Sequence, residues 1–387
     1  MSVLAGVRVV ELANFISAPF ACQLLADFGA EVIKIERPGQ PDQSRTAGGL
    51  HPADAQRSPY FATGLGRNKK SVCLDLAAAD DLAALLELLR TADVLAENFT
   101  PGTLEKWGLG WPRLHELNPR LVLVRISGYG QSGPWRDRPS VDRTAQAFAG
   151  LTHLTGSPDE PPVPAGLAVA DYSAGYLAAL GTLLALRERD SSGLGQVVDI
   201  SLYDALLPML CEIPAEFGCY GRVRSRSGDY YPGSPLMTIV RCQDGTWLQI
   251  AVLGPAAFRR FAAAFGQARA AEDPRFASAD AQDQHRDELR ELVGNWVAVR
   301  TAREVSELCD AARIPCATVQ DFAQLWAHPH VVARGDFITV PDDDFATVPA
   351  AGVIPRLSRT PGAVVRAGPQ PGQDREVLTL TPKERDC

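Results

Sequence analysis

Short runs of β-branched residues alternate with helical patterns along roughly the first 130 residues of the chain. Strands are predicted at residues 7–11, 31–35, 71–76, 94–96 and 121–126. The stretch 19–28 (PFACQLLADF) repeats its apolar residues with a helical period, and residues 79–91 form a second predicted helix, rich in Ala and Leu. Strands that alternate with helices in this way predict an α/β fold, with helices packed on a parallel sheet.

The middle of the chain starts with a strong apolar helix and ends in a segment without periodicity. Residues 172–189 predict a long helix, residues 196–200 a strand and residues 202–211 another helix. Residues 218–235 then gather Gly, Arg, Ser and Pro, which is typical of an irregular connector.

A smaller α+β unit is predicted after this connector. Residues 236–241 and 246–252 flank an Asp-Gly pair, which favours a β-hairpin. Three helices follow, at residues 256–265, 286–299 and 301–312. The tail beyond residue 336 is rich in Pro and Gly and has few periodic segments.

Composition narrows the class of protein. The chain has 387 residues, 46% of them hydrophobic and 22% charged, as a globular protein has. Its formal net charge of −8 argues against a nucleic-acid binder, which usually presents a basic surface. The longest apolar stretch, residues 172–186, is shorter than the roughly 20 residues of a membrane span, and no signal peptide is recognisable. We therefore expect a cytoplasmic protein that binds neither nucleic acid nor membrane.

Neither a metal site nor a dinucleotide-binding loop is expected from the sequence. The eight cysteines are scattered, with no CxxC pair and no cluster of Cys and His at zinc spacing, so we expect reduced thiols and no metal site. One formal G-x-G-x-x-G motif, at residues 128–133, follows the strand at 121–126. The prolines that come after it cannot open a regular helix, and we therefore do not expect a dinucleotide-binding loop.

Asp171 lies where a loop (GLAVADYSAG, residues 166–175) meets the start of the long helix. An aspartate at this place can be a helix N-cap, which accepts hydrogen bonds from free backbone N–H groups. The same position favours the ionised carboxylate, which is the form that can attack an acyl carbon. The small residues Ala170, Ser173, Ala174 and Gly175 would let a bulky thioester approach. The residues alone leave both alternatives open.

Basic residues occur near predicted strand ends, which form the edge where open α/β sheets bind ligands. They are Lys34, Arg37, Lys69, Lys70, Lys106 and Arg143. Each can be a solvated surface charge, and together they could hold a phosphate-rich ligand.

Six ordered segments resemble the class III CoA-transferase family of the CaiB/BaiF type, which includes formyl-CoA transferase. They are LAGVRVVELANFISAPFACQLLADFGAEVIKIERPG at 4–39, GRNKKSVCLDL at 66–76, ADVLAENFTPGTLEKWGLG at 92–110, NPRLVLVRISGYGQSGP at 118–134, GLAVADYSAGYLAALGTLLALRER at 166–189 and GLGQVVDISLYDALL at 193–207. The resemblance is dense over about the first 210 residues and looser beyond them.

The resemblance implies a fold and an assembly. A large Rossmann-like CoA-binding domain would span residues 1–215 and be completed by residues 335–387. Residues 216–235 would form a linker and an active-site loop, and residues 236–334 the small domain. Two such chains would interlock as a homodimer.

The resemblance also implies a reaction on Asp171. Its carboxylate would attack the donor acyl-CoA thioester, and a mixed anhydride and then an aspartyl-CoA thioester would follow before CoA passes to the acceptor acid. CoA and acyl-CoA would be substrates, with no tightly bound cofactor.

Further site residues follow from the resemblance by motif position. Lys106 stands where formyl-CoA transferase has an arginine, and Lys lacks the bidentate contact to phosphate that Arg makes. Oxalate-using members carry a glutamine where this chain has Ile16, which argues against an oxalate or formate substrate. The implied CoA-binding residues are Ile16, Ser17, Arg37, Leu74, Asp75, Leu76, Ala77, Asn98, Phe99, Thr100, Lys106, Pro139, Ser140, Val141 and Asp142. The implied loop over the aspartate is Tyr231, Pro232, Gly233 and Ser234, which holds one glycine.

Two other functions fit the same superfamily. The α-methylacyl-CoA racemases share most of these motifs and move a proton with a His/Asp pair. Their histidine corresponds to Val141 here, although Asp142 follows it. A two-base proton shuttle would therefore lack one base. A non-catalytic CoA-binding protein would have no use for Asp171.

Overall fold

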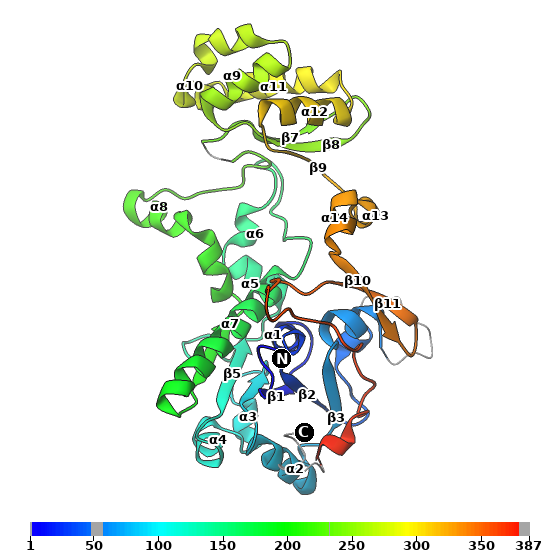
Figure 1. The fold of residues 1–387 in the computed structure, drawn as a ribbon. Helices are drawn as coiled ribbons and strands as arrows, with labels where there is room; N and C mark the ends of the chain where they lie inside the picture. The colour runs from blue at the N-terminus through cyan, green and yellow to red at the C-terminus, as the bar shows by residue number, and fades with distance from the viewer. Residues whose placement is uncertain (1, 48–56, 232, 379–387) are drawn as a thin grey trace. The chain divides into compact units, whose positions relative to one another are not determined.

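The computed structural model describes residues 2–47, 57–231 and 233–378 (Figure 1). The chain divides into two compact units. The first unit comprises Met1–Leu151, Pro164–Arg222 and Pro329–Cys387, and the second comprises Thr152–Val163 and Val223–His328. The first unit therefore takes both ends of the chain.

The first unit is built on a six-stranded parallel sheet with the order β3-β2-β1-β4-β5-β6. The strands are β1 (Arg8–Leu12), β2 (Glu31–Glu36), β3 (Lys69–Cys73), β4 (Val94–Glu97), β5 (Val122–Ser127) and β6 (Val197–Ser201). The predicted α/β fold with a parallel sheet is confirmed. This strand order reverses between β1 and β4, and the carboxyl ends of the strands on either side of such a reversal open the crevice in which ligands bind.

Helices cover both faces of this sheet (Figure 1). Val9 and Val32 face helices α1 (Ser17–Asp27) and α7 (Val169–Ser192). Their chain neighbours Val10 and Ile33 face α2 (Ala79–Leu89), α3 (Thr103–Lys106) and α4 (Trp111–Leu117). Successive side chains of a strand point to opposite faces, so the near-continuous apolar strands are buried on both sides.

Helix α7 packs tightly on α1, and this contact explains its small residues. Ala170 and Ala174 are fully buried in the core that α1 and α7 share. A Cβ on Gly175 would lie 2.8 Å from the backbone oxygen of Ser17 and 2.8 Å from Phe20. The expectation that Ala170, Ala174 and Gly175 clear a path for a thioester is therefore wrong, because these three residues bring two helices together.

The length and composition of α7 would also allow it to cross a membrane. Half of its most apolar window is buried inside the protein, and core helices of soluble proteins have the same character, so this is weak evidence for a span.

Three segments of the first unit differ from the sequence predictions. The predicted helix at 202–211 is a 3-10 helix, Asp204–Leu210, with Pro208 inside it, since proline has no N–H for an α-helical bond. Helix α8 (Glu212–Tyr220) reaches into the predicted connector. The tail after residue 336, expected to lack periodic segments, begins with a hairpin of β10 (Phe337–Asp342) and β11 (Ala346–Ala351). The remaining helices of this unit include α5 (Asp142–Phe148) and α14 (Pro329–Arg334).

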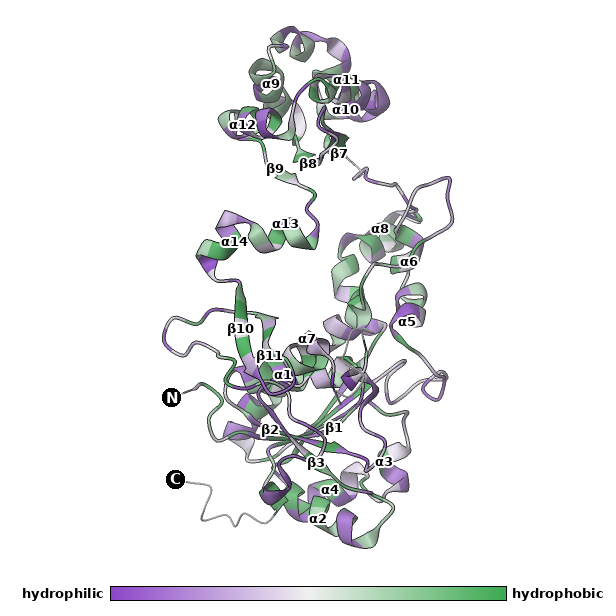
Figure 2. Ribbon diagram, turned by 90° about the vertical axis from the view of Figure 1, so that its right-hand side faces the viewer, coloured by the Kyte–Doolittle hydropathy of each residue, from purple (hydrophilic) through white to green (hydrophobic). Residues whose placement is uncertain are grey.

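The second unit is a small α+β assembly around its own core. An antiparallel sheet of β7 (Met237–Arg241), β8 (Trp247–Ala251) and β9 (Cys316–Thr318) confirms the predicted hairpin. Hydrophobic and hydrophilic residues alternate along its helices in Figure 2, as in amphipathic helices with one buried face. These helices are α9 (Gly254–Ala264), α10 (Ala279–Gln284), α11 (Arg286–Ala298) and α12 (Ala302–Ala312), and the short helices α6 (Leu151–Leu154) and α13 (Phe322–Ala327) lie mostly or wholly within the unit's bounds.

Candidate active site

Two cavities open at the carboxyl ends of the parallel strands, where the strand order predicts a ligand. The first, the Asp171 pocket, has a volume of about 600 Å³ and lies at the ends of β1, β4 and β5 beside α7. The second, the Arg37 pocket, has a volume of about 680 Å³ and lies at the ends of β1, β2 and β3. Asn14, Phe15 and Phe99 line both cavities, so the two adjoin.

The structure brings most of the predicted site residues to these cavities. Those lining the Asp171 pocket are Ile16, Ser17, Asn98, Phe99, Ser140, Val141, Asp142 and Asp171. Those lining the Arg37 pocket are Arg37, Leu74, Asp75, Leu76, Ala77 and Phe99. Thr100, Lys106 and Pro139 line neither cavity and are exposed.

The predicted loop at 231–234 belongs to the second unit. Tyr231 and Ser234 pair across a tight turn, and the N–H of Gly233 donates to the hydroxyl of Tyr230 at 3.2 Å. Pro232 lies outside the described residues. The role of this loop over Asp171 stays a prediction.

Sequence reasoning missed several residues that line the Asp171 pocket, above all Asn14, Phe15 and Ser127. Asn14 and Phe15 come two and three residues after the end of β1, and Ser127 ends β5, so their place near strand ends was the available signal. Among the described residues, the buried Oγ of Ser127 has no hydrogen-bond partner. A polar atom left in this way at a pocket wall is one that a ligand can satisfy.

Asp171 stands in the first turn of α7, but it is not the cap of that helix. The N-cap residue is Ala168, and the side chain of Asp142 on α5 satisfies the helix end from outside. Its Oδ1 accepts the N–H of Ala170 at 2.7 Å and that of Asp171 at 3.3 Å. The N-cap hypothesis for Asp171 is therefore wrong, since Asp142 takes that part.

The four N–H groups at residues 169–172, in the first turn of α7, are also all engaged in other hydrogen bonds. The N–H of Val169 donates to the oxygen of Leu167 at 2.9 Å, and the N–H of Tyr172 donates to Ala168 at 3.0 Å. Burial and then the negative charge of Asp142 raise the pKa of Asp171 to about 7. The expectation that the helix end keeps this carboxylate ionised is wrong, because the donors that would stabilise the anion are already in use.

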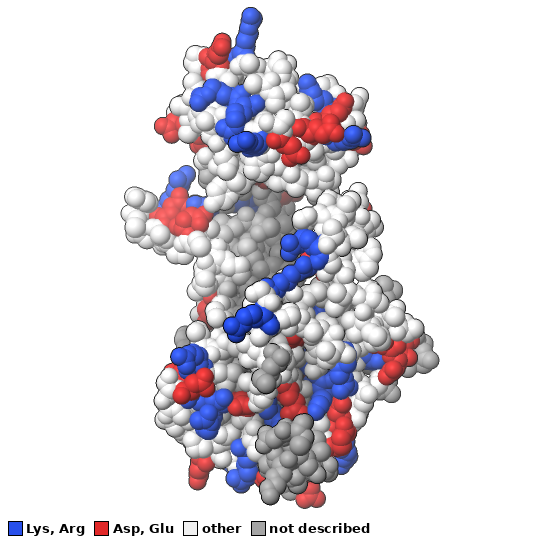
Figure 3. Space-filling view, in the orientation of Figure 1, with Lys and Arg blue, Asp and Glu red and all other residues white. Residues whose placement is uncertain are grey.

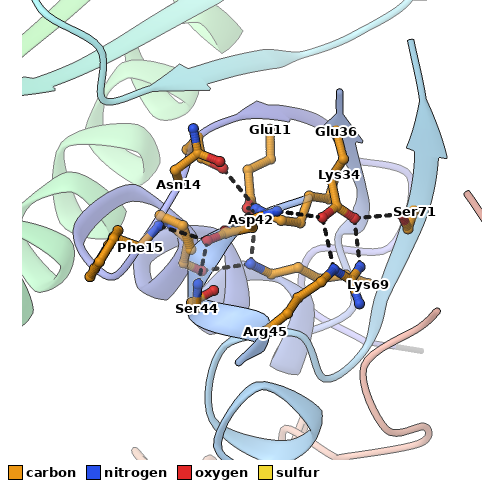
Figure 4. A network of polar contacts seen from close by, with 12 residues as sticks. Glu11, Asn14, Phe15, Lys34, Glu36, Asp42, Ser44, Arg45, Lys69 and Ser71 are labelled. Carbon is orange, nitrogen blue, oxygen red and sulfur yellow. Dashed lines mark hydrogen bonds and ion pairs between the residues drawn. The ribbon is translucent and has the colours of Figure 1, made fainter. Parts of the chain in front are cut away.

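Two buried lysines hold the loop between β1 and α1, which lines both cavities, and the first turn of α1 (Figure 4). Lys34 Nζ donates to the backbone oxygen of Ala13 at 2.7 Å, and Lys69 Nζ donates to that of Pro19 at 2.7 Å. Both lysines also pair with the carboxylate of Glu11, at 2.7 and 2.6 Å. The suggestion that Lys34 and Lys69 hold a phosphate-rich ligand is wrong, because each is fully buried in an ion pair.

Asp42 extends this network to the tip of the loop. Its Oδ2 lies 2.7 Å from Lys34 Nζ, and its Oδ1 accepts the N–H of Phe15 at 3.0 Å. Phe15 has a φ of 65°, a left-handed conformation that residues other than glycine rarely adopt. Burial acts against ionisation of Asp42, yet the charge of Lys34 and the hydrogen bonds it accepts lower its pKa. The network therefore fixes the backbone at the junction of the two cavities.

Asn98, at the end of β4, ties the same loop to the neighbouring strand. Its Oδ1 accepts the N–H of Asn14 at 3.0 Å, and its Nδ2 donates to the oxygen of Asn14 at 2.7 Å. Two strand ends that are separated by more than 80 residues along the chain thus form one wall of the Asp171 pocket.

The remaining electrostatics agree with a small-molecule site. Lys, Arg, Asp and Glu are intermixed on the face drawn in Figure 3, rather than sorted into one basic surface. Among the described residues, no three His, Cys, Asp or Glu side chains are placed to hold a metal ion. The G-x-G-x-x-G segment opens no helix, since the next one, α5, begins at Asp142.

Comparisons with known proteins show which family the chain belongs to. The model of the family described as CoA-transferase family III matches residues 4–375. A succinyl-CoA–D-citramalate CoA-transferase of Chloroflexus aurantiacus is 41% identical over 377 residues, which are 97% of this chain and 93% of that protein. A succinate–glutarate CoA-transferase of Agrobacterium fabrum is 33% identical over 375 residues, 96% of this chain and 93% of that protein.

A solved structure has the same fold over the whole chain. The crystal structure of a CaiB/BaiF family protein from Brucella suis superposes with a TM-score of 0.87 at 28% identity and covers 100% of both chains. The resemblance read from the sequence motifs is confirmed. The chain belongs to CoA-transferase family III, and it is a CoA-transferase whose substrates are CoA thioesters.

Proposed function

We propose that this enzyme moves CoA from succinyl-CoA to a second carboxylic acid and that Asp171 is the nucleophile. The observation that carries the proposal is the place of Asp171, a partly buried carboxylate in a cavity that adjoins a second cavity at the strand ends. A molecule as long as CoA needs such a pair of sites, one for the nucleotide and one for the thioester.

The choice of substrates rests on the similar enzymes. One is named for succinyl-CoA and D-citramalate, and the other for succinate and glutarate. All of these acids carry a second carboxylate. We therefore place a dicarboxylic acid in the acceptor role as well as in the donor.

Each step on Asp171 exchanges one leaving group for another. The Asp171 carboxylate attacks the thioester carbon of succinyl-CoA, which gives a mixed anhydride and expels CoA thiolate. The thiolate attacks the Asp171 carbonyl, which releases succinate and leaves an aspartyl-CoA thioester. The acceptor carboxylate attacks that thioester and again expels CoA, which then attacks the acceptor acyl carbon and frees Asp171. Bonds broken and formed balance, so no other reagent is needed.

The Arg37 pocket is proposed to hold the nucleotide part of CoA. The side chain of Arg37 makes a hydrogen bond of 3.1 Å to Gln40 and is otherwise exposed, which leaves its charge available to a phosphate. Leu74, Leu76 and Ala77 offer an apolar wall with backbone groups beside it. Lys106 is exposed and pairs with no described residue, so it could reach a phosphate at the rim.

The test is an assay of donor and acceptor pairs with the purified protein. Succinyl-CoA is incubated with citramalate, malate or glutarate, and new CoA thioesters are identified by mass spectrometry. At least one new thioester is expected together with an equal amount of free succinate. If CoA binds and no acid accepts it, the proposal fails. Deuterium exchange at the α-carbon of a 2-methylacyl-CoA without any acceptor would point to the racemase instead.

The activity should fall at low pH because of the pKa of Asp171. This pKa is raised to about 7 by burial and the charge of Asp142, and attack requires the anion. As pH rises through 7 the ionised fraction increases, so kcat/KM for the donor is expected to rise about tenfold per pH unit below 7 and to level off above it. Initial rates between pH 5 and 9 check this. A flat profile down to pH 5 would contradict it.

The proposed assembly is a homodimer. Several apolar side chains of α7 are exposed, among them Tyr176, Leu180 and Leu184, at 52%, 51% and 61%. An exposed apolar helix face of this kind favours burial against a second chain. Light scattering during size-exclusion chromatography distinguishes a dimer from the 41.6 kDa monomer.

A further inference from the structure

The Asp171 pocket contains a positively charged side chain that the transfer steps above do not use. Arg143, the second residue of α5, lines this cavity beside Asp142 and Asp171. Among the residues that line the cavity in the described part of the chain, Arg143 is the one cation. Its side chain is exposed and forms no ion pair or hydrogen bond with any described residue.

The two acidic residues beside Arg143 in the pocket, Asp142 and Asp171, have other roles. Asp142 Oδ1 accepts the N–H groups at the start of α7, and its Oδ2 accepts Nε2 of Gln146 at 2.5 Å. In the proposed reaction the carboxylate of Asp171 attacks the acyl carbon. The guanidinium is therefore free to bind an anion that enters the pocket.

A dicarboxylic substrate brings such an anion with it. The succinyl group carries a free carboxylate at its fourth carbon, counted from the thioester carbonyl, and the acceptor diacid keeps one carboxylate after its other carboxylate has reacted. A further negative charge close to the carboxylates of Asp142 and Asp171 is unfavourable unless a cation faces it. Arg suits this task because its planar N–H groups match a carboxylate with two parallel hydrogen bonds.

We propose that Arg143 binds the carboxylate at the far end of the acyl chain and thereby selects dicarboxylic substrates over monocarboxylic ones. This inference rests on the proposed function, because it assigns a role in the same pocket. Arg143 is a specificity-determining residue here and takes no part in forming or breaking the thioester.

The decisive experiment follows the first half of the reaction alone. The protein is mixed with succinyl-CoA or butyryl-CoA without any acceptor, and the rate at which CoA becomes attached to the enzyme is followed by intact-protein mass spectrometry. The two acyl groups have equal length, and a methyl group replaces the far carboxylate in butyryl-CoA. The wild type is expected to react about 10- to 100-fold faster with succinyl-CoA, the factor a charge-assisted hydrogen bond supplies.

Two substitutions separate this role from a structural one. Arg143→Met should slow the reaction of succinyl-CoA about 10- to 100-fold and change that of butyryl-CoA less than about threefold. Arg143→Lys keeps the positive charge but lacks the planar guanidinium. Its rate with succinyl-CoA should therefore lie between that of the wild type and that of Arg143→Met. Arg113→Met is the matched control, because Arg113 is an exposed arginine on α4 that lines neither cavity. It should leave both rates unchanged.

The outcomes distinguish this inference from the proposed function. Equal losses for both donors in Arg143→Met and Arg143→Lys, with thermal melting unchanged, would overturn the inference and point to a CoA contact. A wild type that reacts equally fast with both donors would also overturn it and leave the proposed function standing. A wild type that takes up CoA from no donor would overturn the proposed function itself.

Discussion

Asp171→Asn is expected to reduce CoA transfer by roughly 10⁴-fold or more, which is the scale of loss when a nucleophile is removed. The amide has the size of the carboxylate and leaves the N–H bonds from Ala170 and Asp171 to Asp142 in place. It cannot form the anhydride, because its nitrogen and oxygen are poor nucleophiles at neutral pH. The measurement is the rate of thioester exchange between succinyl-CoA and an accepted acid.

The same variant should also change the free energy of unfolding, because the negative charge of Asp171 destabilises the folded protein. A raised pKa in the folded state means that the folded protein binds a proton more tightly than the unfolded chain does. The stability that this group contributes is full below the ordinary aspartate pKa of 3.8 and is lost as the pH rises toward about 7. Asp171→Asn removes this loss, and at pH 8 it is expected to raise the free energy of unfolding by about 1 to 3 kcal/mol.

Two further experiments test whether the loss of activity in Asp171→Asn comes from the loss of the nucleophile. Hydroxylamine should trap Asp171 as a hydroxamate in the wild type when succinyl-CoA is present, and should leave Asp171→Asn unmodified. Asp159→Asn, at an exposed aspartate that lines neither cavity, is the control and should retain full activity. An Asp171→Asn enzyme with more than about a tenth of the wild-type rate would exclude covalent catalysis at this residue.

Lys34→Met is expected to lower the free energy of unfolding by about 3 to 5 kcal/mol, the cost of leaving buried charges without their partner. Lys34 pairs with Glu11 and Asp42, each at 2.7 Å, and all three side chains are almost fully buried. Burial by itself lowers the pKa of Lys34, but the two carboxylates outweigh it and raise that pKa. Urea unfolding at pH 7 followed by circular dichroism measures the change.

A neighbouring lysine provides the control. Lys70 pairs with Glu31 at 2.7 Å, but both side chains are about one-third exposed, so Lys70→Met should cost less than about 1 kcal/mol. Similar losses in the two variants would contradict a special contribution of the buried network. Because the network also holds Phe15 at the junction of the cavities, Lys34→Met should raise KM for succinyl-CoA as well.

Local patterns in the sequence were enough for the elements that carry the site. The strands β1 to β6 and the helices α1, α2 and α7 lie within a few residues of their predicted positions, because continuous apolar runs and helical periods are properties of neighbouring residues. The predicted cavity residues after β1, β3 and β4 also follow from position, since parallel strands present their carboxyl ends at one edge.

Local sequence patterns could not predict which charged residues form ion pairs with one another. Lys34 in EVIKI and Lys69 in GRNKK look like surface charges, yet both are buried against Glu11, which lies 23 and 58 residues away in the chain. The hairpin of β10 and β11 was missed for a related reason, because Pro and Gly hide its weak alternation.

The sequence by itself determined the parallel α/β fold, the family and the position of Asp171 at the start of a long helix. Only the tertiary structure decided what surrounds that aspartate. Asp142, 29 residues earlier, reaches the end of α7 and takes its free N–H groups, and its charge and the burial together raise the pKa of Asp171 to about 7. Folding brings the two carboxylates together across a loop, and periodicity along the chain carries no information about such a contact.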